Sequence, residues 1–407
     1  MTFFYKEVLC EMFQTFKMRS AIGAAVLLLS LAASGAQAAP VRARVLFIGD
    51  IMAHIQQIDA AERNDPKKGR TWDFAPQFHR VKPLLAGAFV VGNLETTFAG
   101  ESRGYAGYPS FNTPDSLTDA LKGLEIDLVT LANNHILDRD ASGARRTAAV
   151  LDEADIAWTG LGTGEVPAND ALLLEREGLR WAFVNWTYGS NRSPASKDVH
   201  LNVISERAVA EGMARARALS ADVVVACFHW GDEYHLSPNA RQRQAADQAL
   251  AEGADLVIGT HPHVLQPVEV RVGEDGAARA IAWSLGNFVS FQRTLPRERT
   301  CILSAEFERE DDGRTRLTRL AAAPLQVLLM PSGRRVRRTE VTYAGTGRAF
   351  NHFGISKEGV ARLQRVGRAV LDFLGAQEET DEWGFYTLWS EASPDVLPAP
   401  RRTSPSN

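Results

Sequence analysis

Residues 41–54 read Val-Arg-Ala-Arg-Val-Leu-Phe-Ile-Gly-Asp-Ile-Met-Ala-His. The apolar side chains from Val45 to Ile48 are consecutive rather than alternating with polar ones, which is typical of a strand buried on both faces. Gly49 permits a sharp turn of the backbone, and Asp50 places a carboxylate just past the strand. Because ligands of open α/β sheets bind outside the carboxyl ends of the strands, this stretch predicts a strand over 43–49 that delivers a functional acid.

The alternation of short β-rich runs with helical stretches continues along the chain. Strands are predicted near 43–49, 88–92, 127–131, 156–159, 181–187, 222–228, 255–259 and 280–285. Helices are predicted near 76–86, 114–122, 141–153, 206–219 and 239–252. This repetition indicates an α/β fold with a mixed sheet, and we assign residues 41–290 to its main domain.

The sequence changes character after residue 290. Antiparallel strands are predicted over 301–308, 315–320 and 324–330, and an amphipathic helix over 357–374. We treat residues 291–392 as a C-terminal β/α extension and the Pro-, Ser- and Arg-rich residues 393–407 as a flexible tail.

The first 38 residues resemble a signal peptide. A basic segment with Lys17 and Arg19 precedes the apolar run 21–33 and the small-residue sequence Ala36-Gln37-Ala38. We expect cleavage after Ala38 and a periplasmic or secreted protein; a retained N-terminal anchor is the alternative. Residues 1–17 precede a normal signal-peptide start at Met18 and are interpreted as an upstream start-codon artefact.

Composition excludes several classes of protein. With 407 residues, 45% hydrophobic and 23% charged, the chain has the apolar material for a large core, so disorder throughout is excluded. The formal net charge of −4 gives no general attraction to nucleic acid, which we do not expect as a partner. The sequence shows neither a Gly-rich phosphate loop nor a Ser nucleophile elbow, which disfavours nucleotide-dependent chemistry.

Nearly every predicted strand ends in an acid, an amide or an imidazole. Such a residue alone is usually a turn, a cap or a core histidine, but the series at successive strand ends predicts one shared metal site. The strand-end donors are Asp50, Asn93, Glu95, Asn133, Asn134, His135, His229, His261 and His263. Carboxylate, imidazole and carboxamide ligands together suit Mn, Zn or Fe, so we expect one or two divalent ions.

The segment His261-Pro262-His263 carries two of these imidazoles. In an extended segment, alternate side chains point to the same face, so both rings are expected to reach one site. The alternative is a polar turn after a strand.

The motifs together resemble the capsule-synthesis CapA family over about residues 44–290. They are Gly49-Asp50-Ile51-Met52, Asn93-Leu94-Glu95, Asn133-Asn134-His135 with Asp138, His229-Trp230-Gly231-Asp232-Glu233, and His261-Pro262-His263. That family is associated with bacterial poly-γ-glutamate production and is related to calcineurin-like metallophosphoesterases. The resemblance implies a metallophosphoesterase-like sandwich of two mixed β-sheets flanked by helices, with the site at one edge.

The resemblance also implies roles for individual residues. Glu95 takes the place of a carboxylate that bridges two metals. The first metal would further be held by Asp50 and His263, and the second by Asn134, His229 and His261. His135 would be catalytic, protonating a leaving oxygen or stabilising the transition state, and Asp138 would orient its ring.

The sequence departs from the phosphoesterase pattern at two positions. Met52 stands where that pattern has a His, and thioether sulfur is a poor ligand for hard divalent ions. His54 is a candidate substitute. At position 95, Glu replaces Asp and adds a methylene to the bridging side chain.

Other polar residues beside the ligands are expected to contact substrate or to support the ligands, packing and capping being the alternative. This group comprises His54, Asn93, Asn133, Trp230, Glu233 and Asn287.

Two functions compete on these observations. The first is an exported hydrolase or transferase that acts on poly-γ-glutamate or a small phosphoester through metal-activated water. The second is a non-catalytic assembly or export factor that binds the polymer or a membrane-bound synthase complex. Hydrolysis of cell-wall peptides or amides is a third candidate, which would use the same water in a different pocket.

Overall fold

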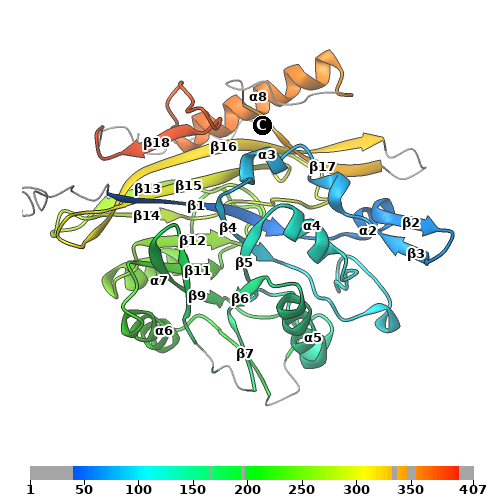
Figure 1. Cartoon of the computed structure of the whole chain (residues 1–407), viewed down its shortest axis with the longest axis horizontal. Helices are drawn as coiled ribbons and strands as arrows, with labels where there is room; N and C mark the ends of the chain where they lie inside the picture. The colour runs from blue at the N-terminus through cyan, green and yellow to red at the C-terminus, as the bar shows by residue number, and fades with distance from the viewer. Residues whose placement is uncertain are drawn as a thin grey trace, which may run out of the picture. The chain divides into compact units, whose positions relative to one another are not determined.

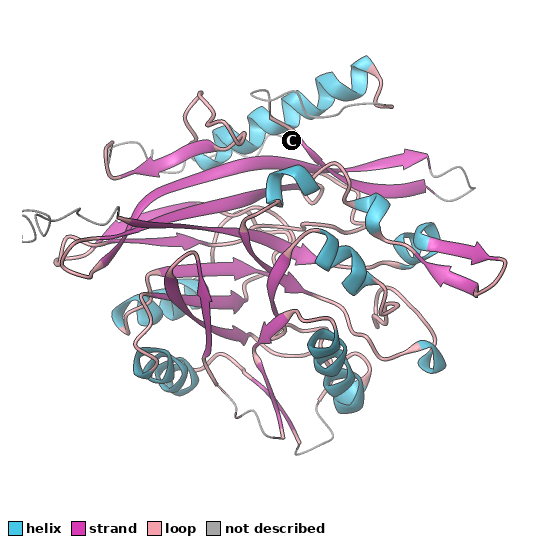
Figure 2. Cartoon of the chain, viewed as in Figure 1, coloured by secondary structure: helices cyan, strands magenta, loops and turns pink. Residues whose placement is uncertain are grey.

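The computed structural model describes residues 40–164, 167, 169–193, 198–331, 337–345 and 354–393. The predicted signal peptide, and the predicted tail from residue 394 onward, lie outside the described residues. Within Val41 to residue 393, two β-sheets stack face to face and helices cover them (Figure 1 and Figure 2). None of the described helices combines the length and the apolar composition needed to span a bilayer.

The first sheet has β1 at its centre. It runs in the order β17-β16-β15-β1-β4-β5-β6, with β18 paired to β16. β1 pairs in parallel with β4 and antiparallel with β15, so the sheet is mixed. Its strands are β1 (Val41–Ile51), β4 (Phe89–Leu94), β5 (Ile126–Thr130), β6 (Ala157–Thr159), β15 (Arg299–Arg309), β16 (Thr315–Pro331), β17 (Arg337–Tyr343) and β18 (Tyr386–Ser390).

The second sheet runs in the order β13-β14-β12-β11-β9-β8. Its four inner strands are parallel, whereas β13 and β8 pair antiparallel at the two edges. Its strands are β8 (Leu172–Arg176), β9 (Leu179–Thr187), β11 (Val223–His229), β12 (Leu256–Thr260), β13 (Val268–Val272) and β14 (Ala278–Ala282). Two small ribbons, β2 (Glu62–Asp65) with β3 (Gly69–Trp72) and β7 (Leu161–Thr163) with β10 (Val199–Leu201), lie outside these sheets.

Apolar side chains on both faces of β1 explain why it is central. Val45 and Phe47 join the core between the sheets, together with Trp181 and Phe183 of β9. Leu46 on the opposite face joins a second core beneath α4 and α5. A consecutive apolar run therefore fills two layers at once, as expected for a strand buried on both faces.

Helices cover the outer faces of the sandwich. α6 and α7 pack on the second sheet, α4 and α5 on the first, and α8 lies along β16 (Figure 1). The helices are α2 (Ile55–Ala61), α3 (Lys82–Leu85), α4 (Leu117–Gly123), α5 (Asp140–Glu153), α6 (Glu206–Ala218), α7 (Ala240–Ala251) and α8 (Lys357–Leu374). The predicted sandwich of two mixed sheets flanked by helices is confirmed.

One predicted helix and two predicted strands differ from the structure. The helix predicted over 76–86 is a 3-10 turn at Ala75–Gln77 followed by the single-turn α3. Pro76 and Pro83 lack the backbone N–H that a continuous helix needs, so each begins a short turn instead. The strands predicted over 315–320 and 324–330 form one strand, β16, because β15 and β17 pair along its successive parts.

Asp255, at the start of β12, gives the fold a testable pH dependence. Burial raises the pKa of its carboxyl from 3.8 to about 6, although Val224 N–H donates a 2.8 Å hydrogen bond to it. A raised pKa means that the folded state holds a proton that the unfolded state has released, so stability falls as pH rises from about 4 to about 6. We expect Asp255→Asn to gain stability relative to the parent across this interval, measured by urea unfolding in chelator. Parallel pH curves for the two proteins would contradict this.

Candidate metal centre

The six predicted ligands meet where the carboxyl ends of five strands from both sheets come together. All six side chains are buried, with at most 3% of any of them exposed. They follow or end β1, β4 and β5 in the first sheet and β11 and β12 in the second: Asp50, Glu95, Asn134, His229, His261 and His263.

Asp50 connects the two halves of this cluster. Asn93, its register partner on β4, donates from Nδ2 to Asp50 Oδ1 at 2.8 Å. From the second sheet, His263 Nδ1 lies 3.2 Å from Asp50 Oδ2, and the backbone N–H of His261 donates to the same oxygen at 3.4 Å. One carboxylate thus ties both sheets together at the site.

His263 is held in one tautomer. Its Nδ1 lies 2.9 Å from Asn287 Oδ1 as well as near Asp50, and both of these oxygens only accept hydrogen bonds. The ring proton therefore sits on Nδ1, which leaves Nε2 with a free lone pair that faces Glu95 Oε1 at 3.8 Å. This orientation by an oxygen acceptor is the one that ligating histidines use in metal sites.

His229 is fully buried in the cluster. Its Nδ1 is 3.0 Å from Thr260 Oγ1, and its Nε2 is 2.8 Å from Asn134 Oδ1 and 3.6 Å from Glu95 Oε1. Burial holds the pKa of this imidazole well below 6.5, so the ring is neutral, as a metal ligand must be.

Two buried atoms in the cluster have no hydrogen-bond partner among the described residues, Glu95 Oε1 and His261 Nδ1. Burial, and secondarily the charge of Asp50, raises the pKa of Glu95 well above 4.5, while burial lowers the pKa of His261 to about 3. Each orphaned group costs about 1–3 kcal/mol. A divalent cation would satisfy both, so the residues present fit a metal.

The donor atoms form two overlapping trios. Asp50, Glu95 and His229 each offer one atom within 4.8 Å of the others, as do Glu95, His261 and His263. Glu95 is common to both trios, which is the position of a bridging carboxylate. The trios group His229 with Asp50 and His261 with His263. The resemblance instead implies His263 with Asp50 at the first metal and His229 with His261 at the second.

The backbone at His261-Pro262-His263 is not extended as predicted. φ is 96° at His261 and 55° at His263, values that L-residues rarely adopt. The rings still converge, with centroids 5.7 Å apart, but a tightly turned backbone brings them together rather than the alternation of a strand.

His135 and Asp138 form the predicted pair. His135 Nδ1 lies 2.8 Å from Asp138 Oδ2, which also accepts the Phe111 N–H at 2.7 Å. The ring packs edge-on against Phe111, with centroids 4.7 Å apart. The carboxylate therefore keeps the ring proton on Nδ1 and leaves Nε2 available to take up a proton.

Most of the predicted supporting residues hold the ligands or their neighbours. Asn133 donates to Asn93 Oδ1 at 3.3 Å and to the Leu94 carbonyl at 2.8 Å, which fixes Asn93 beside Asp50. His54 begins α2, and its Nδ1 accepts the Phe291 N–H at 3.3 Å.

Trp230 and Glu233 lie outside the cluster of donor atoms. Trp230 donates its indole N–H to the Trp283 carbonyl at 3.0 Å and stacks on Phe228, so it belongs to the core of the second sheet. Its side chain points into the packed layer, which is the packing alternative given for this residue. Glu233 is exposed. Burial, and secondarily a hydrogen bond with Glu233, raises the pKa of the Tyr234 phenol to about 12.

Two residues after β9 belong to the site although the sequence analysis did not select them. The Tyr188 ring lies 4.5 Å from the His261 ring, centroid to centroid, and is 46% exposed. Asn191 lies 3.4 Å from His135 Nδ1 and donates its backbone N–H to the Asn134 carbonyl. The run of polar residues after the strand predicted over 181–187 was the signal that could have revealed them.

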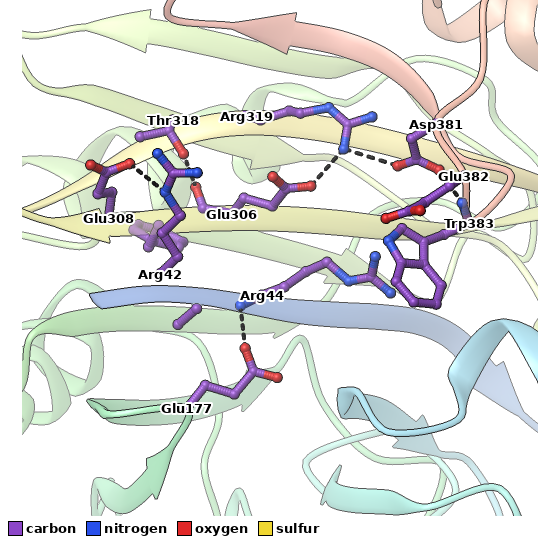
Figure 3. A pocket seen from close by; sticks show the side chains of 12 residues that line it. Arg42, Arg44, Glu177, Glu306, Glu308, Thr318, Arg319, Asp381, Glu382 and Trp383 are labelled. Atoms are coloured by element: carbon purple, nitrogen blue, oxygen red, sulfur yellow. Dashed lines mark hydrogen bonds and ion pairs between the residues drawn. The ribbon is translucent and has the colours of Figure 1, made fainter. Parts of the chain in front are cut away.

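A pocket of about 470 Å³ lies near the opposite end of β1, away from Asp50 (Figure 3). Its acids face arginines: Arg319 contacts Glu306 at 2.6 Å and Asp381 at 3.0 Å, and Arg42 contacts Glu308 at 3.0 Å. Paired in this way, these carboxylates do not form a set of metal donors, which distinguishes this pocket from the cluster at Asp50.

Comparison with known sequences gives a match over residues 44–292 to the family described as bacterial capsule synthesis protein PGA_cap. The chain is 27% identical to the PGA biosynthesis protein CapA of Bacillus subtilis, over 67% of this chain and 70% of that protein. It is 29% identical to the capsule biosynthesis protein CapA of Bacillus anthracis, over 52% of this chain and 53% of that protein. The chain thus spans about half the length of the second relative.

Among solved structures, the 5'-nucleotidase from Candida albicans is similar with a TM-score of 0.41 and 10% sequence identity. The similarity covers 81% of this chain and 58% of that one.

The orphaned carboxylate gives a test of the metal centre. In metal-free protein, we expect Glu95→Gln to raise the free energy of unfolding by on the order of 1 kcal/mol, because it removes a buried charge beside Asp50. The same change should lower bound metal, measured by elemental analysis, because the shared ligand is lost. Glu274→Gln, on an exposed turn, is the matched control and should change neither quantity. A destabilised variant that retains its metal would contradict this account of the site.

Proposed function

Because the chain belongs to the family of bacterial capsule synthesis proteins PGA_cap, we propose that it is an exported, metal-dependent enzyme that hydrolyses or transfers poly-γ-glutamate. Two relatives are named for the biosynthesis of PGA and of capsule, which supports this substrate. The observation that carries the proposal is the pair of orphaned buried atoms, Glu95 Oε1 and His261 Nδ1, inside a cluster of imidazoles and carboxylates.

The residues that would hold the metal are those of the two trios, with Asn134 Oδ1 beside His229. Their mixture of carboxylate, imidazole and carboxamide suits Zn, Mn or Fe. A divalent ion supplies Lewis acidity, which polarises a carbonyl or phosphoryl oxygen and lowers the pKa of water.

The protein's own residues orient the metal ligands and supply a proton to the leaving group. Asp50 and Asn287 fix the His263 ring, and burial keeps the imidazoles of His229 and His261 neutral by lowering their pKa. When an amide bond breaks, the leaving nitrogen needs a proton. His135 would take up at Nε2 the proton that the attacking water loses and deliver it to that nitrogen, while Asp138 holds Nδ1–H and stabilises the charged ring.

A second function is favoured by one observation. Met52 is buried and places no nitrogen or oxygen side-chain donor at the position where metallophosphoesterases carry a histidine. A site weakened in this way is compatible with a non-catalytic factor that binds poly-γ-glutamate for a membrane-bound synthase.

The first experiment measures metal content and turnover. We expect purified protein to contain one or two divalent ions and to release new amino groups from poly-γ-glutamate, with turnover abolished by chelator and restored by metal. His261→Ala should lower kcat/KM by at least about 100-fold, since even neighbours of ligands contribute about 10- to 100-fold. His200→Ala, an exposed histidine on β10, is the control and should match the parent. Metal-loaded protein that binds the polymer without turnover would favour the non-catalytic function.

The second experiment separates proton transfer from metal binding. His135→Gln keeps a polar side chain but removes the titratable ring, so kcat should fall by about 100-fold or more while metal content stays at the parent level. Asp138→Asn should lower kcat less severely and change its pH profile, because the tautomer is no longer fixed. Equal turnover of His135→Gln and parent would exclude the role given to this histidine.

A further inference from the structure

Arg297 lies near the donor cluster and has no ionic partner among the residues that the structure describes. It lies in the segment between β14 and β15, and among the described residues its guanidinium makes neither a hydrogen bond nor an ion pair. The central carbon of that guanidinium lies 3.4 Å from the centroid of the Tyr234 ring. Stacking on an aromatic face holds the side chain in place while leaving its N–H donors available.

Both members of this pair are hydrogen-bonded to the segment His261-Pro262-His263, called here the two-histidine segment, or to the residue that orients it. Tyr234 donates its backbone N–H to the Pro262 carbonyl at 2.7 Å, and its ring centroid lies 6.2 Å from that of His263. The Arg297 carbonyl accepts a hydrogen bond from Asn287 Nδ2 at 3.2 Å, and Asn287 Oδ1 lies 2.9 Å from His263 Nδ1. The arginine and the tyrosine are therefore anchored to the residues that build the metal centre.

The C-terminal part of the chain fixes the next residue, Glu298. This buried carboxylate accepts hydrogen bonds from Arg362 of α8 at 2.5 Å and from Gln326 of β16 at 2.8 Å. The Val327 N–H also donates to the Glu298 carbonyl at 3.1 Å. Arg297 thus projects from a backbone that α8 and β16 hold in place.

We propose that Arg297 and Tyr234 form a subsite that binds a carboxylate of the substrate next to the bond under attack. This inference rests on the proposed function. Every residue of poly-γ-glutamate carries a free α-carboxylate, and a guanidinium fork binds a carboxylate through two parallel hydrogen bonds. The subsite therefore selects an acidic γ-linked chain over a neutral one.

The charges around the site explain why such a residue is needed. Asp50, Glu95 and the exposed Glu233 are acids in the same region. After burial, the charges of Asp50 and Glu233 contribute to raising the pKa of Glu95. An acidic polymer that approaches them is repelled unless cations compensate. Arg297 supplies one fixed positive charge beside the cation that the donor cluster would hold.

The test compares a γ-linked glutamate oligomer with the same oligomer bearing α-methyl esters. Calorimetric titration of the full chain, both chelated and loaded with Mn²⁺, gives affinities that do not depend on turnover. We expect the parent to prefer the acid, Arg297→Gln to bind it at least about 10-fold more weakly without preference, and Arg297→Lys to fall between them. Tyr234→Phe should retain the preference, because it keeps the ring on which Arg297 stacks.

Arg368→Gln removes an equal charge from the exposed surface of α8 and should bind as the parent does. Two results overturn the subsite: equal acid binding by Arg297→Gln and parent with the preference intact, or no binding of the acid by the parent. Failure of the proposed function gives a different result, since binding and preference for the acid then persist without any turnover.

Discussion

The Asp50 carboxylate is the contact on which the site depends, because it joins the edges of the two sheets. One oxygen accepts from Asn93 of the first sheet, and the other accepts from the two-histidine segment that follows the second. Without the stacking of the sheets these groups would be far apart, since 211 residues separate Asp50 from His261. The apolar core between the sheets therefore stabilises the fold and also sets the geometry of the donors.

Strand chemistry made most of this arrangement predictable. Consecutive apolar runs indicate strands buried on both faces, and polar residues at their carboxyl ends gather at one edge of an α/β sheet. That reasoning selects Asp50, Glu95 and His229 without coordinates. It cannot say which way a side chain turns after the strand ends, which is why Trp230 packs in the core instead.

Contacts between residues far apart in the sequence determine the features of the site that local patterns do not predict. The position of Arg297 depends on Glu298, whose partner Arg362 lies 64 residues further along the chain, and no local pattern predicts such a pair. The change in sequence character after residue 290 predicted a C-terminal extension there. In the structure, β15 from this part of the chain pairs with β1 at the centre of the first sheet. This part of the chain therefore shapes the edge of the site as well as completing the sheet.

Strain at the two-histidine segment indicates what the fold is organised to do. Positive φ at His261 and His263 costs of order 1–3 kcal/mol for each residue, and the orphaned His261 Nδ1 adds a desolvation cost. A chain optimised for stability alone would place glycines there and pair the buried nitrogen. Packing of the two sheets offsets these costs, and a bound cation would remove the desolvation cost at His261 Nδ1. At this segment the costs fall beside buried lone pairs that a cation would occupy, which fits the proposed metal centre.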